Sequence, residues 1–171
     1  MLANKLGADY ESLRQLAKIK TITVKSNDVC FDLKVRVPVK REMEAIQAAI
    51  TEPSPELVAK IYEQFAAPLR KTLDEAPDGF LEAINSAAQK IVMTDDDIQI
   101  DGTSIKNVAQ MTAIYQVQVE KYFALLVSAT GEPITETYDD IAEEFPESVI
   151  REIVSKIDEV IKPNYKDTKK N

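Results

Sequence analysis

Residues 29–46 read VCFDLKVRVPVKREMEAI, and the spacing of their apolar side chains changes once along this stretch. From Val29 to Val37 apolar and polar residues alternate, which is typical of a β-strand with one buried face. After Pro38 the apolar residues follow helical spacing, at Val39, Met43 and Ile46. Proline is disfavoured inside a sheet, so the strand should end there. The stretch therefore predicts a strand that a proline connects to an amphipathic helix.

The residues before this strand supply its hairpin partner. Thr21-Ile22-Thr23-Val24 is rich in β-branched residues, and Ser26-Asn27-Asp28 is a cluster of turn-forming residues. We therefore expect an antiparallel β-hairpin over 21–37. Two strands alone are marginally stable, so this hairpin should pack on helices or pair with another strand.

The rest of the chain predicts a helical body over 40–162, divided by proline-marked turns. Ser54 is expected to cap a helix that begins at Pro55, because proline is favoured at the first helical position. Pro68 lies inside the same helical pattern and should kink or split the helix near Ala67. A further helical face is expected from Phe80 to Ile91.

Shorter elements are expected elsewhere. Ile98 and Ile100 alternate within an aspartate-rich segment, which favours a short strand or turn. The longest helix is predicted over 106–128, and a last helix should follow Phe145-Pro146 and stop before Pro163. We expect a short helix capped by Asp9 near the start and a flexible tail over 163–171.

Together these elements predict an α+β fold that is predominantly α, with an N-terminal β-hairpin followed by helices joined by proline-marked turns. A length of 171 residues is typical of one domain, so we expect residues 1–171 to form a single domain.

Composition excludes several classes of partner. The chain has 29 acidic and 21 basic residues and a net charge of −8, whereas binding to nucleic acid needs clustered cations. The sequence has no apolar run as long as a membrane span and begins without the apolar segment of a signal peptide. We therefore expect neither nucleic acid nor a membrane as a partner, and a cytoplasmic location.

Residues suited to catalysis are scarce. The chain contains no His, the commonest general base and zinc ligand, and its four glycines are isolated, so no phosphate-binding loop is present. Asp97, Asp101 and Gly102 superficially resemble a calcium loop, but Val108 stands where that loop needs a glutamate. Cys30 is expected to be an inert, half-exposed thiol. We predict no catalytic residue, metal or cofactor, and no enzymatic activity.

Two features could serve binding. Six acidic residues between 136 and 147 form either a solvated helix face or a docking site for a basic segment of a partner; they are Glu136, Asp139, Asp140, Glu143, Glu144 and Glu147. The long helix and the last helix carry broad apolar stripes, which either fill the core or contact a partner. The residues predicted to contact a partner are Tyr115, Val119, Tyr122, Val149, Ile153, Ile157 and Val160.

The order of these elements resembles a known family. A hairpin ending in Leu33-Lys34-Val35-Arg36-Val37-Pro38 and followed at once by Lys40-Arg41-Glu42-Met43-Glu44-Ala45-Ile46 resembles the N-terminal region of tail assembly chaperones of long-tailed bacteriophages. The acidic helical body, the Phe145-Pro146 helix start and the charged end are similar to that family as well.

The resemblance implies a non-enzymatic role in the host cytoplasm. Such chaperones bind and solubilise the helical tape measure protein while the tail tube polymerises around it. The implied partner is the tape measure protein or another phage tail protein, and a homo-oligomer remains an open alternative. Two other functions stay open: a structural or tail-completion protein of the virion, and an acidic inhibitor that mimics DNA.

Overall fold

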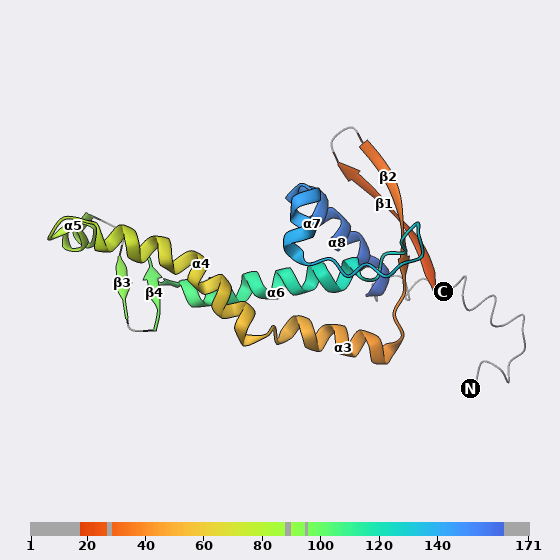
Figure 1. The fold of residues 1–171 in the computed structure, drawn as a ribbon, viewed down its shortest axis with the longest axis horizontal. Helices are drawn as coiled ribbons and strands as arrows, with labels where there is room; N and C mark the ends of the chain where they lie inside the picture. Colours follow the sequence, from red (N-terminus) through yellow and green to blue (C-terminus); the bar gives the residue numbers. More distant parts are fainter. Residues whose placement is uncertain (1–17, 27–28, 88–89, 95, 163–171) are drawn as a thin grey trace, which may run out of the picture. The chain divides into compact units, whose positions relative to one another are not determined.

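The computed structural model describes residues 18–26, 29–87, 90–94 and 96–162, and it confirms the predicted α+β, mostly helical class. The helix predicted after Asp9 and the tail predicted over 163–171 lie outside these ranges. The chain divides into two compact units (Figure 1). The first unit contains the described residues up to 48 and those from 118 onwards, and the second contains 49–117.

The first unit is built on the predicted hairpin. Strand β1 (Ile19–Ser26) pairs antiparallel with β2 (Val29–Arg36), and Ile22 lies opposite Leu33. Helix α3 (Lys40–Thr51) starts just beyond Pro38, as the change from alternating to helical spacing of the apolar residues predicts. The remaining helices of this unit are the end of α6 (Ile105–Phe123), α7 (Tyr138–Glu144) and α8 (Glu147–Ile161).

The hairpin is supported in both of the expected ways. Helix α8 packs against β1, and residues 125–127 pair with the free edge of β2 through a bridge between Val35 and Leu126. The alternation of side chains places one face of the hairpin in the core of this unit. The buried core residues of the hairpin and α8 are Ile22, Val24, Val35, Val149, Ile150, Ile153, Val154 and Ile157.

The long helix ends earlier than predicted. Helix α6 stops at Phe123, not near residue 128, because the following residues leave the helix to pair with β2. The continuous apolar run Leu125-Leu126-Val127 is compatible with either a helix or a buried strand. Here the run is extended and not helical, because it pairs with the available edge of β2.

The second unit combines helices with a small sheet. Helix α4 (Pro55–Asp74) packs on the first part of α6 through Ile61, Ala109 and Ala113. Helix α5 (Phe80–Ala87) is followed by three short antiparallel strands in the order β3-β4-β5; they are β3 (Ile91–Met93), β4 (Ile98–Ile100) and β5 (Thr103–Ser104).

The strand expected at Ile98–Ile100 is present, but the helical face expected to reach Ile91 is wrong. Ile91 belongs to β3. The side-chain amide of Asn85 accepts a hydrogen bond from the Ile91 backbone N–H at 2.7 Å and donates one to the Ile91 carbonyl at 3.2 Å. Asp101 and Gly102 both have positive φ angles, of 51° and 79°. This pair is a favoured two-residue hairpin turn, so β4 and β5 form where the aspartate-rich segment ends.

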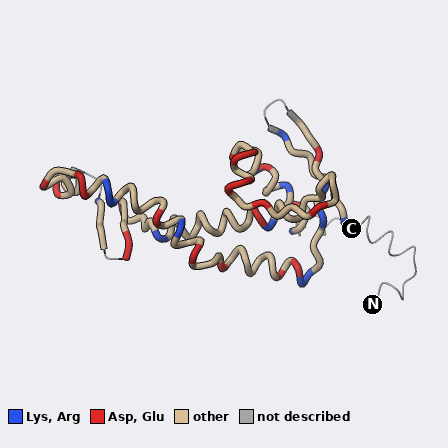
Figure 2. Tube along the Cα trace, in the orientation of Figure 1, with Lys and Arg blue, Asp and Glu red and all other residues tan. Residues whose placement is uncertain are grey.

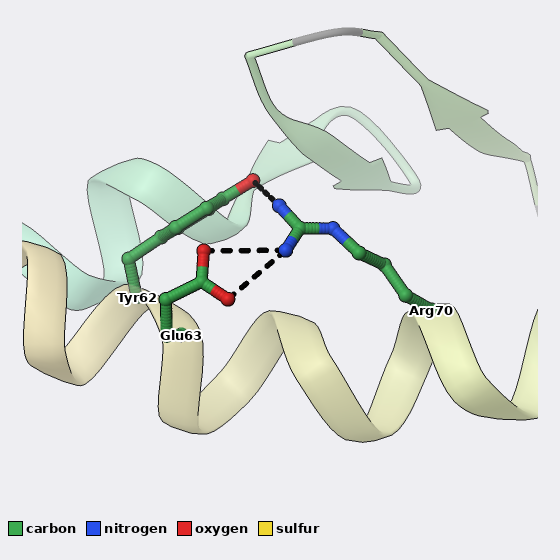
Figure 3. A network of polar contacts seen from close by, with 3 residues as sticks. All are labelled: Tyr62, Glu63 and Arg70. Carbon is green, nitrogen blue, oxygen red and sulfur yellow. Dashed lines mark hydrogen bonds and ion pairs between the residues drawn. The ribbon is translucent and has the colours of Figure 1, made fainter.

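Pro68 does not split α4, which is continuous from Pro55 to Asp74. Proline lacks the N–H that would complete the helical hydrogen bond at this position. Arg70 spans the interruption: its guanidinium donates to Glu63 at 3.0 Å and to the Tyr62 hydroxyl at 3.3 Å (Figure 3). The hydrogen bond to Glu63 raises the pKa of Arg70. These contacts join the two sides of the proline on one face of the helix.

Ser54 caps α4 as predicted, since its hydroxyl accepts from the backbone N–H of Leu57 at 3.2 Å. We expect Ser54→Ala to lower the free energy of unfolding by about 1 kcal/mol, because the helix loses an acceptor for an otherwise unpaired N–H. Urea denaturation followed by circular dichroism measures this change. Ser54→Asp keeps an acceptor and should remain close to the wild type; equal losses in both variants would contradict the capping role.

Candidate functional site

The first unit contains an apolar groove between β2 and α7. Its cavity volume is about 660 Å³. One side is formed by Phe31 and Leu33 of β2 and by residues 126–129, and the other by α7. The remaining apolar lining comes from the end of α6, the segment between α6 and α7, α7 itself, its C-cap and α8; in that order these residues are Phe123, Ile134, Ile141, Phe145 and Ile153.

The pairing of residues 125–127 with β2 forms one end of this groove. The Arg36 N–H donates to the Leu125 carbonyl, and the Val127 N–H donates to the Lys34 carbonyl, both at 2.8 Å. These bonds bring residues 126–129 alongside β2. The edge of β2 is therefore covered near Lys34 and Arg36, and the groove opens beside Phe31 and Leu33.

Aromatic packing holds the base of the groove. The rings of Phe123 and Phe145 meet edge to face with centroids 6.0 Å apart, a favourable geometry for an aromatic pair. Phe145 is also the C-cap of α7, and its N–H donates to the Ile141 carbonyl at 3.0 Å. The same residue therefore ends α7 and fixes its position over α6.

Two further hydrogen bonds fix the helices around the groove. The backbone N–H of Tyr138, at the start of α7, donates to the Glu120 carboxylate at 2.9 Å. The Tyr122 hydroxyl donates to Asp158 of α8 at 2.6 Å, and Lys162 pairs with the same carboxylate at 2.8 Å. Burial is the main cause that raises the pKa of Tyr122, so its hydroxyl stays protonated at neutral pH.

Acidic side chains line the α7 side of the groove. Of the six acidic residues between 136 and 147, Glu136, Asp140 and Glu144 line it, and Figure 2 shows acidic residues concentrated along α7. Asp140 forms a capping box with Thr137, whose hydroxyl donates to it at 2.6 Å. This hydrogen bond lowers the pKa of Asp140 and keeps the carboxylate charged. Lys34 also lines the groove on the β2 side, but the carboxylates outnumber it, so the groove combines an apolar interior with a rim of net negative charge.

The seven residues predicted to contact a partner are mostly interior. Tyr115 and Val160 are half-buried, whereas the other five are buried: Val119, Tyr122, Val149, Ile153 and Ile157. Ile153 lines the groove, and Val160 lines a smaller hollow beside β1. Contact with a partner stays a prediction for all seven, and the fully buried ones can make it only if the core opens locally.

Sequence reasoning missed the residues that give the groove its shape. Phe31 and Leu33 were expected on the buried face of the strand, and both are half-buried at the groove instead. No local signal distinguishes them from core residues, because the groove depends on where 125–129 and α7 lie. Cys30 lies on the opposite, polar face of β2 and is exposed.

Arg36 and Glu42 form an ion pair at the junction of β2 and α3, with two short hydrogen bonds of 2.7 and 2.6 Å. The hydrogen bond from Arg36 is the main cause that lowers the pKa of Glu42. A lowered folded-state pKa stabilises the fold above the ordinary glutamate pKa, and this contribution is lost as the pH falls through the lowered value.

We therefore expect Glu42→Gln to destabilise the protein by at most about 1 kcal/mol at neutral pH, since both side chains are more than a third exposed. The difference from the wild type should vanish in acid, where Glu42 is protonated. Urea denaturation at several pH values measures it. A difference that persists unchanged in acid would contradict the ion pair as its cause.

Two classes of site are not found in the part of the chain that the structure describes. It contains no group of three or more His, Cys, Asp or Glu side chains placed to hold a metal ion. Among the same residues, no helix has both the length and the apolar character that crossing a bilayer requires.

Comparison with known proteins gives no match to a family model, to a curated protein or to a solved structure. The apolar interior of the groove can cover apolar side chains, and its carboxylates can pair with cations at the rim.

Proposed function

We propose that this chain is a non-enzymatic binding protein that covers apolar segments of a client, and that it acts as a tail assembly chaperone of a long-tailed bacteriophage in the host cytoplasm. The observation that carries the proposal is the groove beside β2, with its half-buried Phe31 and Leu33 and its acidic rim. The family resemblance of the hairpin and α3 supports the choice of client, which is the tape measure protein.

The physical requirements of such a chaperone agree with these features. A long amphipathic client exposes apolar surface before assembly, and that surface favours aggregation. A chaperone with a net charge of −8 adds charge to each complex and so opposes association between complexes. Modest affinity at each site is sufficient when many copies bind one client, and it allows the tube subunits to displace them.

The groove favours a chaperone over a DNA mimic, whereas an experiment is needed to separate a chaperone from a structural virion protein. A DNA mimic needs carboxylates spaced like phosphates on one surface, and an apolar groove adds nothing to that role. A structural virion protein would remain in mature particles, whereas a chaperone leaves. Mass spectrometry of purified particles separates these two roles.

Co-expression tests the proposed function directly. The client in this test is the proposed one, the tape measure protein, produced with and without this chain. We expect the soluble fraction of the client to rise several-fold when the chain is present, because its apolar segments are covered. Equal solubility in the two conditions would contradict the proposal.

A further inference from the structure

The outer edge of β2 has backbone groups that point away from β1, on the side where residues 125–127 pair with it. In an antiparallel pair, successive residues direct their N–H and C=O groups to alternate sides of the strand. The Val37 N–H donates to the Lys18 carbonyl of the β1 side, whereas Lys34 and Arg36 bond to residues 125–127 on the other side. Even-numbered residues of β2 therefore direct their backbone groups away from β1.

Cys30 and Asp32 continue this pattern beyond the part of the edge that residues 125–127 cover. Within the described ranges, their outward N–H and C=O groups make no backbone hydrogen bond to another segment. Asp32 lines the groove, while its side chain accepts from the Thr23 hydroxyl at 2.7 Å on the polar face of the hairpin. The open strand edge therefore reaches the groove at Asp32 and continues beyond the groove lining at Cys30.

The geometry points to one occupant: an extended segment of the client that pairs antiparallel with β2 at Cys30 and Asp32, places alternate apolar side chains in the groove and carries Lys or Arg at its ends. The inference rests on the proposed function and specifies how the client binds. An extended chain can add to an exposed sheet edge, where main-chain bonds supply affinity and side-chain pockets supply specificity.

The side-chain alternation determines which client residues direct side chains into the groove and which form main-chain hydrogen bonds with β2. In this register a client residue opposite Phe31 directs its side chain to the same face as Phe31, into the groove. The client residues opposite Cys30 and Asp32 exchange the main-chain hydrogen bonds and direct their side chains to the polar face. The negative charge of Glu136, Asp140 and Glu144 at the rim favours cationic ends.

Synthetic peptides test this arrangement with the full chain. The probe is fluorescein-labelled KKVTVTVKK, in which the central Val is meant to lie opposite Phe31 and the two Thr opposite Cys30 and Asp32. Fluorescence anisotropy measures its affinity. A Glu-flanked peptide, EEVTVTVEE, tests the charge. Two further peptides are N-methylated, one at both Thr nitrogens and the other at two Val nitrogens.

We expect the Glu-flanked and the Thr-methylated peptides to bind at least about tenfold more weakly than the probe, since one lacks the charge match and the other lacks two donors to β2. The Val-methylated peptide should bind within about threefold of the probe. The backbone amide resonances of Cys30 and Asp32 should shift on binding.

Any other ranking overturns the inference, as does an absence of peptide binding or unchanged resonances at Cys30 and Asp32. The outcome is separable from that of the proposed function. If the chain keeps its client soluble but the peptides fail, only this mode of binding is wrong. If client solubility is independent of the chain, the proposed function is wrong.

Discussion

Replacing Ile157 with alanine is expected to lower the free energy of unfolding of the first unit by about 2–5 kcal/mol. The Ile157 side chain is fully buried on α8, which packs against β1. Removing its outer carbons loses the free energy of burial and leaves a cavity that the surrounding helix and sheet can fill only partly. Urea denaturation followed by circular dichroism measures the change. Ile157 does not line the groove, so the variant reports on packing alone.

Ser155→Ala is the matched control on the same helix. Ser155 is exposed, and alanine is a good helix former, so its effect should stay within about 0.5 kcal/mol. Similar losses in the two variants would mean that α8 does not pack on the hairpin as described.

Reversing the charge of the rim is expected to reduce binding of the co-expressed client by about tenfold or more. Glu136→Lys with Glu144→Lys places cations where the groove has carboxylates, so the attraction for a cationic segment becomes repulsion. Both side chains are exposed, so the fold should be retained. Isothermal titration calorimetry with the purified client, at two salt concentrations, measures the loss and its dependence on screening.

The control has the same change in net charge at another place. Glu132→Lys with Glu143→Lys alters two exposed carboxylates of the same region that do not line the groove. We expect this variant to keep the wild-type affinity within about threefold. If both double variants weaken binding alike, net charge and not the groove rim determines affinity.

Local patterns were sufficient to predict most of the elements. Alternation in residues 29–37 identified β2, and Ser54-Pro55 identified the start of α4. These signals depend on neighbouring residues only. They failed where long-range contacts compete: the apolar run after Phe123 pairs with β2, and Asn85 draws Ile91 into a strand.

The candidate site was only partly predictable for the same reason. The acidic stretch was identified, with a docking site as one of its two interpretations, and three of its carboxylates line the groove. The groove itself requires residues 31–33, 123–129 and 141–153 to pack together. No local spacing in the sequence predicts that they do. An apolar stripe likewise cannot show which of its side chains are buried, as Val119 and Ile157 illustrate.

Hydrogen–deuterium exchange of this chain, free and bound to its client, tests most directly whether the groove is the binding surface. We predict slower exchange on binding at residues 30–33 of β2 and along α7, with little change on α4 and α5. Protection confined to α4 and α5, or no protection at all in a chain that keeps the client soluble, would contradict the groove as the place where the client binds.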